Sequence, residues 1–467
     1  MADRTVVCRV ALGAVTLKLT LTPKLLAKPL GAAVLTPFLG AYNKKTADGR
    51  VQVANLACVK IDGVEVAHDD DSIACSELLP NDTHDIVLYP LSPLKQIPLP
   101  GLTTSPANAA GGGGGLAASP VLSSLPLSFP FDCESPFLFA VYHLDRYPPG
   151  QDNMGPDKRL LKGHSIGADF GNPAGWSMYH GEEGVPGFPK HPHRGFETIT
   201  VTRRGLVDHT DSLGNGGRFG YGDVQWMTAG KGISHAEMFP LLDRENENVL
   251  ELFQIWVNLP KASKMVPPSF KMLWAEDIPK QTIDGAEITL VAGALPGLAS
   301  PAAPPPDSYA QPANGAEFLV CTIKLAAGAS WTLPAVTATG ERELNRNLYF
   351  YAGDKIAIAD RKLLKHAKVK VDPSMSVAIT ADASGPAEVL VLQGRDIGEP
   401  TVQHGPFVGT TSDDIMKAFS DYQATGFGGW PWKSNALAFP RDRPRFAKFA
   451  NGELEERPIP TKDCAAK

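Results

Sequence analysis

Two short pairs of metal-capable side chains are the strongest chemical feature of the sequence. His191 and His193 form a His-x-His pair, and His235 and Glu237 form a His-x-Glu pair further along the chain. Alternate residues of a β-strand point to the same face of a sheet, so each pair can direct both side chains at one point. If the two strands lie near each other in a barrel, three imidazoles and one carboxylate meet in its interior. Such a ligand set suits a divalent transition metal.

A surface hairpin with solvated histidines is the simpler explanation of the same residues, because a His-x-His pair alone is a weak indication of a metal site. The second pair strengthens the metal interpretation. The segments 211–217 and 220–223, which lie between the pairs, are rich in glycine. This composition is typical of tight turns between short strands.

Four other polar residues are candidates for the site. Glu197 follows His193 by four residues, and if one strand runs through both, its carboxylate faces the same side as the histidines. The sequence therefore leaves open whether Glu197 or Glu237 is the carboxylate ligand. We interpret His143 as a core or rim histidine, and we interpret His209 and Asp211 as hydrogen-bonding residues.

The segments around both pairs resemble the pirin family, whose members are bicupins with two small β-barrels in one chain. The resemblance spans about 135–440 and is carried by residues 178–181, 191–205, 208–214, 222–230, 232–237, 253–260 and 399–408. It implies that the N-terminal barrel holds one metal, usually iron, through His191, His193, His235 and Glu237. It places Glu197 beside the ligands, where a carboxylate can fix the tautomer of a metal-bound imidazole.

The resemblance also implies an activity. Quercetin 2,3-dioxygenases cleave the central ring of a flavonol with O2 and release carbon monoxide, so the expected partners are a flavonol-like small molecule and O2. Histidine and carboxylate ligands suit Fe2+ and also Mn, Ni, Cu or Zn. Glu237 has a second expected role as the catalytic acceptor of a proton from a substrate hydroxyl. The alternative function is a metal- and redox-sensing binding protein that acts as a transcription co-regulator, as some pirins do.

The first part of the chain differs from the rest. In residues 1–90, strand patterns flank a predicted helix at 24–42, and this order resembles a ubiquitin-like β-grasp domain. We expect either a module that binds a protein partner or a structural appendage. Residues 91–130 are rich in Pro, Gly, Ser and Ala, which predicts a flexible linker.

The predicted fold class is therefore mainly β: two cupin barrels (double-stranded β-helix, jelly-roll) in tandem, preceded by a small α+β ubiquitin-like domain. The expected boundaries are 131–262 for the metal-binding cupin, 263–287 for a connector, 288–440 for a second cupin without metal, and 441–467 for a tail. The second half carries neither a His-x-His nor a His-x-Glu pair. The tail contains a basic and aromatic cluster that we interpret as solvated: Arg441, Arg443, Arg445, Phe446, Lys448 and Phe449.

The composition excludes several other classes of protein. The chain has 467 residues, 43% of them hydrophobic and 20% charged, and a net charge of −6. These values are ordinary for a globular protein, and no overall basic field favours direct nucleic-acid binding. The six cysteines show no CxxC pairing, which argues against zinc fingers and a disulfide scaffold. With no secretory signal and no apolar run of membrane-spanning length, we expect a soluble protein without membrane association, cytoplasmic and/or nuclear.

Overall fold

The chain divides into two compact units, and each is described by itself: Met1–Gly114 and Gly115–Lys467. The computed structural model describes residues 119–460, apart from 168, 180–183 and 338–339, together with residue 34 and the segments 6–12, 15–21, 56–61, 64–66 and 83–90. Among these residues, no helix is long and apolar enough to cross a membrane.

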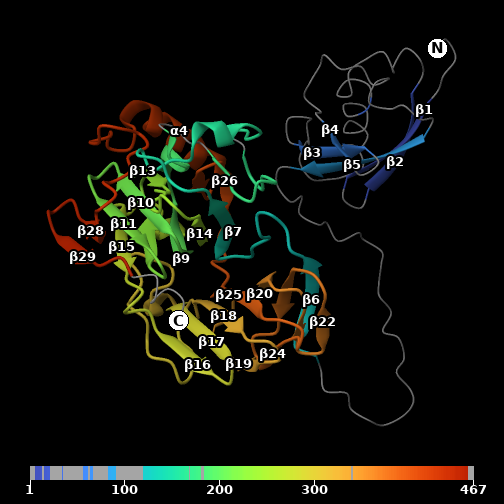
Figure 1. The fold of residues 1–467 in the computed structure, drawn as a ribbon. Helices are drawn as coiled ribbons and strands as arrows, with labels where there is room; N and C mark the ends of the chain where they lie inside the picture. Colours follow the sequence, from blue (N-terminus) through green and yellow to red (C-terminus); the bar gives the residue numbers. More distant parts are fainter. Residues whose placement is uncertain are drawn as a thin grey trace, which may run out of the picture. The chain divides into compact units, whose positions relative to one another are not determined.

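The first unit contains a five-stranded sheet (Figure 1). Its strands are β1 (Val6–Leu12), β2 (Val15–Leu21), β3 (Leu56–Ile61), β4 (Val64–Val66) and β5 (Thr83–Pro90). They lie in the order β2-β1-β5-β3-β4, and the central pair, β1 and β5, is parallel. The helix predicted at 24–42 lies outside the described residues, so the ubiquitin-like domain stays a prediction.

Two sheets form the N-terminal barrel of the second unit. They are built from β7 (Phe137–Tyr147), β8 (Gly187–His193), β9 (Phe196–Arg204), β10 (Leu206–Asp211), β11 (Gly216–Gly220), β12 (Val224–Thr228), β13 (Ile233–Met238), β14 (Asn248–Asn258) and β15 (Ser269–Leu273). One sheet contains β11-β10-β13-β8, and the other has the order β15-β12-β9-β14-β7. The glycine-rich segments predicted as turns lie where β10 gives way to β11 and where β11 gives way to β12.

The C-terminal barrel repeats this two-sheet construction. Its strands are β16 (Lys280–Ile283), β17 (Ala286–Ala292), β18 (Leu319–Leu325), β19 (Ser330–Leu333), β20 (Leu344–Ala352), β21 (Ile356–Ile358), β22 (Arg361–Leu363), β23 (Ala367–Val371), β24 (Val377–Ala381) and β25 (Ala387–Arg395). Short 3-10 helices lie at Lys158–Leu161, Lys261–Ser263 and Pro312–Asn314. β15 pairs with β12, whereas β16 pairs with β17. The predicted connector 263–287 is therefore divided between the two barrels.

The structure also differs from the predicted linker at its end. β6 (Val121–Pro126) lies within 91–130 and pairs antiparallel with β23, so it forms one edge of the seven-stranded sheet of the second barrel. This strand is mostly exposed, and Leu122 and Leu125 keep 58% and 51% of their surface. Composition missed it because an edge strand is held mainly by backbone hydrogen bonds on one side.

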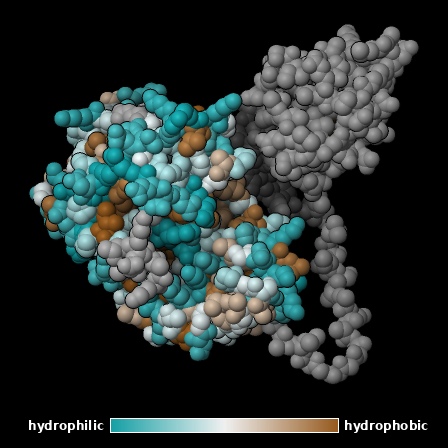
Figure 2. Space-filling model, in the orientation of Figure 1, coloured by the Kyte–Doolittle hydropathy of each residue, from teal (hydrophilic) through white to brown (hydrophobic). Residues whose placement is uncertain are grey.

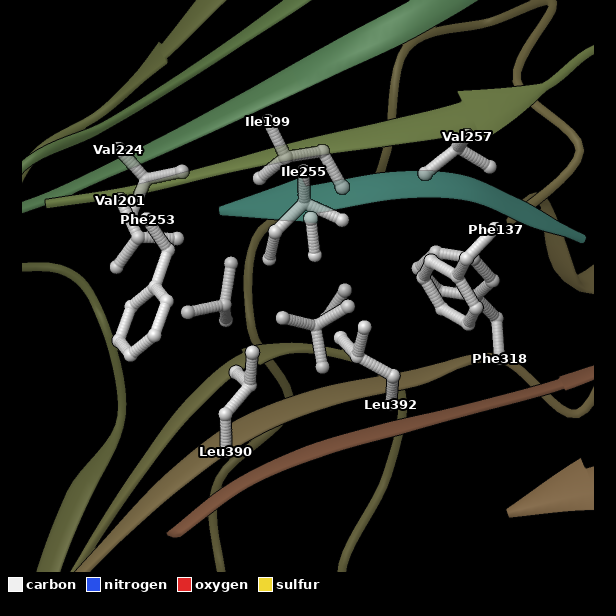
Figure 3. Close-up of a cluster of buried hydrophobic side chains, with 14 of the residues drawn as sticks. Phe137, Ile199, Val201, Val224, Phe253, Ile255, Val257, Phe318, Leu390 and Leu392 are labelled. Carbon is white, nitrogen blue, oxygen red and sulfur yellow. The ribbon is translucent and has the colours of Figure 1, made fainter. Parts of the chain in front are cut away.

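The two barrels share one hydrophobic core (Figure 3). Ile199 and Ile255 of the first barrel face Leu392 of the second, and the rings of Phe137 and Phe318 lie 5.1 Å apart at its end. In the view of Figure 2 the surface of this unit is mainly hydrophilic, with small separate hydrophobic patches. Each barrel also has a hydrophobic core of its own.

The last part of the chain returns to the first barrel. After β26 (Val402–His404) and β27 (Phe407–Gly409), helix α4 (Ser412–Thr425) starts with a capping box at Thr411 and Asp414. β28 (Arg445–Lys448) then pairs with β11, and β29 (Leu454–Arg457) pairs with β28 (Figure 1). The described part of the predicted solvated tail, residues 441–460, therefore contains a strap of two strands that extends the sheet of the N-terminal barrel. Arg445 and Phe446, assigned to the solvated cluster, are buried.

Candidate metal centre

Strands β8 and β13 bring the two predicted pairs together. They are antiparallel, with His191 opposite His235 and His193 opposite Ile233. A bulge follows His235 and shifts the register before Glu237. The three histidines offer nitrogen atoms that all lie within 4.8 Å of one another. The strand-parity argument therefore placed the imidazoles correctly around one point.

The protonation of these imidazoles suits metal binding. The Nδ1 of His191 lies 2.8 Å from the carbonyl oxygen of Pro189, so an N–H on Nδ1 leaves the lone pair on Nε2. Burial lowers the pKa of His193 and His235 well below the ordinary value, and neighbouring histidines add to the effect. Both rings are therefore neutral, which is the form of histidine that binds a metal.

His235 shows the clearest need for a partner. The residue is fully buried, and neither of its ring nitrogens finds a hydrogen-bond partner in the part of the chain that the structure describes. Buried polar atoms are rarely left without a partner, because the loss of water is costly. A cation held by the three imidazoles would bind one of these two nitrogens.

Glu237 lies beside the imidazole cluster. Its Oε2 is 3.9 Å from the Nε2 of His235. Its Oε1 accepts a hydrogen bond of 3.2 Å from the hydroxyl of Thr200, and its Oε2 accepts one of 2.9 Å from Gln254. Burial raises the pKa of Glu237, and the neighbouring His209 and these hydrogen bonds oppose that rise. The carboxylate is thus oriented, and a nearby cation would keep it ionised.

His209 and Asp211 lie behind His235. The ring centroids of His209 and His235 are 5.5 Å apart, and the Nε2 of His209 lies 3.3 Å from the Oδ2 of Asp211. Asp211 also accepts hydrogen bonds from Asn215. This arrangement agrees with a hydrogen-bonding role for both residues.

The structure differs from the expectation that Glu197 lies beside the ligands. β8 ends at His193, and Gly195 then turns the chain with a φ of 84°, a left-handed conformation that favours glycine. The alternation of side chains along β8 therefore cannot be extended to Glu197, which lies on the next strand. Its carboxylate accepts hydrogen bonds of 2.7 Å from Thr228 and 2.6 Å from Ser308. Ser308 lies in the second barrel's insertion, the segment 293–318 between β17 and β18. Glu197 belongs to the contact between the two barrels.

Sequence analysis missed the residues that surround the imidazoles. The ring centroids of Phe196 and Trp256 lie 5.0 and 5.2 Å from that of His193, and Thr200 and Gln254 bind Glu237. A usable signal existed, because Gln254 and Trp256 lie two residues apart in the largely apolar run 250–259, and alternate residues of a strand share a face.

Comparisons with known proteins cover most of the second unit. Family models described as pirin and as the pirin C-terminal cupin domain match residues 155–257 and 320–428. Pirin-1 of Arabidopsis thaliana is 36% identical over 241 residues, which are 51% of this chain and 77% of that protein. A Pseudomonas aeruginosa protein provisionally named quercetin 2,3-dioxygenase is 34% identical over 247 residues, which are 51% of this chain and 79% of that protein.

Among solved structures, the quercetin 2,3-dioxygenase from Acinetobacter baumannii is similar, with a TM-score of 0.52 and 26% sequence identity. The similarity covers 67% of this chain and 99% of that one. Together with the family matches, it confirms the predicted tandem cupin barrels.

Proposed function

The chain belongs to the pirin family, and from this premise we propose that its N-terminal barrel is the centre of a metal-dependent dioxygenase that cleaves a flavonol in the manner of quercetin 2,3-dioxygenases. The observation that carries the proposal is the convergence of three imidazoles from β8 and β13. The names of the Pseudomonas relative and of the Acinetobacter structure support the choice of reaction.

The residues that would hold the metal are His191, His193, His235 and Glu237. The donor set fits a divalent transition metal, because three imidazoles and one carboxylate suit Fe2+ and also Mn, Ni, Cu or Zn. A redox-active ion such as Fe2+, when bound, supplies the electron transfer that a reaction between a flavonol and O2 requires. We assign iron as the native metal in this proposal.

The residues around the ligands exclude water, orient the carboxylate of Glu237 and leave one side of the centre open to a substrate. Phe196 and Trp256 cover His193 with apolar surface and exclude water from that side. Thr200 and Gln254 hold the carboxylate of Glu237 in one orientation. His191 is the most exposed of the three histidines, so a planar substrate reaches the centre from the side of that ring.

The direct test is oxygen uptake by the iron-loaded protein after quercetin is added. We expect uptake and loss of the flavonol absorbance by the unmodified protein. His193→Ala should abolish both metal binding and uptake, whereas His366→Ala, a change at an exposed histidine of the second barrel, should preserve both. Full activity of His193→Ala would refute the proposal. Absence of uptake by the unmodified protein, with iron confirmed bound, would also refute it.

A second candidate function is a metal- and redox-sensing protein that binds a transcription regulator. It is favoured by the separate five-stranded sheet of the first unit, which lies outside the residues matched by the family models. Oxidation of Fe2+ to Fe3+ changes the charge of the site by one unit and so alters the field at the surface near His191. Hydrogen exchange of the Fe2+ and Fe3+ forms should then differ in the segments around His191. Identical exchange would exclude this mechanism.

A further inference from the structure

A buried histidine on β7 faces the same interior as the metal centre. β14 lies between β7 and β9, with Gln254 opposite Val141 on one side and opposite Thr200 on the other. Opposed residues of neighbouring strands share a face, so Val141 belongs to the wall that carries Gln254 and Thr200. His143 is two residues further along β7, so it shares this face about 7 Å along the strand. It therefore projects into the barrel interior next to the residues that hold Glu237.

His143 is the end of a chain of hydrogen bonds. The hydroxyl of Tyr179 donates to Asp145 at 2.8 Å, and the Nδ1 of His143 lies 2.7 Å from the same hydroxyl oxygen. A phenol has one proton, so if Tyr179 gives it to Asp145, its oxygen can only accept from His143. The proton of His143 is then on Nδ1, and the lone pair is on Nε2. No hydrogen-bond partner of this Nε2 is found among the residues of the structure's described segments.

The surroundings support an active histidine. His143 and Tyr179 are 6% and 3% exposed, and burial lowers the pKa of His143 to about 4, so the imidazole is neutral. Tyr179 has a φ of 50°, which is uncommon for an aromatic residue and is typical of positions under functional constraint. The ring centroid of Phe188 lies 6.3 Å from that of His143 and 6.4 Å from that of His191. One side chain thus borders both His143 and the most exposed metal ligand.

We propose that His143 is the catalytic base that accepts the hydroxyl proton of the flavonol, and that Tyr179 and Asp145 position it. This inference rests on the proposed dioxygenase function and assigns its proton acceptor. Glu237 would hold the metal, and a carboxylate committed to a cation is a weak base. A separate neutral imidazole on the same wall has a lone pair on Nε2 that no cation occupies, and Tyr179 and Asp145 are placed to stabilise the ring once it accepts a proton.

The step is a simple proton transfer. The O–H bond of the substrate breaks, an N–H bond forms at Nε2 of His143, and the electron pair stays on the flavonol oxygen. The positive charge on the ring is stabilised through Tyr179 by the Asp145 carboxylate, as in other oriented histidines. The proton leaves to water when the product is released.

The test uses the full-length Fe2+-loaded protein without oxygen, so that a bound flavonol accumulates. The flavonolate anion absorbs at longer wavelength than the neutral flavonol, so the spectrum of bound quercetin reports the transfer directly. We expect the anion in the unmodified protein and the neutral form in His143→Asn. The asparagine amide keeps a donor for Tyr179 but has no basic nitrogen. With O2 present, kcat of His143→Asn should fall about 10²- to 10⁴-fold, the usual range for loss of a general base.

Two further variants control for structural effects. Tyr179→Phe should retain metal and lower the fraction of bound quercetin that is anionic, because Nδ1 of His143 loses its acceptor. If His143→Asn loses metal, Tyr179→Phe alone tests the role of His143. His366→Asn, at an exposed histidine of the second barrel, should match the unmodified protein.

The outcomes separate the two proposals. Flavonolate formation in the unmodified protein without O2 consumption would retain the role of His143 and overturn the dioxygenase function. The role of His143 would be overturned if O2 consumption were equal in the unmodified protein and His143→Asn. It would also be overturned if the anion spectrum were unchanged in both His143→Asn and Tyr179→Phe. Bound quercetin that stays neutral in the unmodified protein, or no binding at all, would overturn it as well.

Discussion

Two neutral side chains hold the carboxylate of Glu237 at the metal centre. Gln254 donates to its Oε2 at 2.9 Å, and the Thr200 hydroxyl, whose one proton is shared between two acceptors, lies 3.2 Å from its Oε1 and 2.7 Å from the side-chain oxygen of Gln254. Glu237 is 4% exposed, so water cannot replace these contacts well. Such outer contacts orient metal ligands and raise their affinity.

We therefore predict that Gln254→Leu weakens metal binding. The leucine has similar volume but no donor, so Glu237 loses one of its two hydrogen bonds. Affinity for Fe2+ or a substitute such as Co2+ should fall by about 10- to 100-fold in competition with a chelator, as is typical for outer-shell mutations. Gln423→Leu, at an exposed residue of α4, is the matched control. Equal affinities in all three proteins would show that Gln254 does not hold a metal ligand.

At this scale the sequence predicted the imidazole cluster well and the position of Glu197 poorly. His191 and His193 required only that alternation hold over three residues of one strand, and it does. Glu197 required alternation to continue through Gly195, whose φ of 84° ends the strand. Glycine tolerates both strand and turn conformations, so the sequence could not distinguish them.

At the scale of elements, the strap of β28 and β29 completes the first barrel. Its Arg445 is buried and donates to Asp223, at 2.7 Å, and to Glu276. Asp223 is fully buried beside β12 and also accepts from the backbone of Gly220. β28 approaches β11 closely because Gly217 has no side chain, since a Cβ there would lie 2.8 Å from the carbonyl oxygen of Phe446.

We expect Arg445→Met to destabilise the protein strongly. The change leaves the Asp223 carboxylate buried without its cation, and breaking a buried pair in this way costs about 3–5 kcal/mol. Urea unfolding followed by tryptophan fluorescence measures the loss. Arg443→Met on the same segment removes an ion pair with Glu456 that is partly solvated, and should cost no more than about 1 kcal/mol. Similar losses for both variants would contradict the structural role assigned to Arg445.

The elements that sequence analysis missed share one physical property. β6, β15 and β28 are short, and each is defined by a partner strand, namely β23, β12 and β11. Longer strands such as β7 and β14, each of 11 residues, carry more of their own apolar signal. Short strands at sheet edges depend on distant partners, and local periodicity carries little information about them.

At the scale of the whole second unit, Glu197 lies in the contact between the barrels. Its partners are Thr228 from the first barrel and Ser308 from the insertion of the second. The residue is fully buried near Asp307, and burial raises its pKa to about 7. The tandem arrangement could be predicted because the motifs of this chain resemble a family with two barrels. The contact at Glu197 joins residues far apart in the chain, and no local pattern indicates it.

The raised pKa of Glu197 predicts how the stability of this unit changes with pH. Its pKa is about 7 when folded and 4.5 ordinarily. Between these values the folded protein keeps a proton that the unfolded chain releases, so the free energy of unfolding falls as pH rises from 4.5 to 7 and then levels off. At about 1.4 kcal/mol per pH unit the total change is about 3 kcal/mol.

Glu197→Gln removes this one titration. Its amide is uncharged and has the size of the protonated acid, and its oxygen can still accept from Ser308, so the variant should equal the unmodified protein at pH 4.5 and exceed it by about 3 kcal/mol above pH 7. Urea unfolding at a series of pH values measures the difference in the free energy of unfolding between the variant and the unmodified protein. The contributions of the other titrating groups are common to both proteins and cancel. Glu341→Gln, at an exposed position, should show no such trend. A constant difference between Glu197→Gln and the unmodified protein would mean that Glu197 stays ionised in the barrel contact, and that the two barrels are joined there by a charged group.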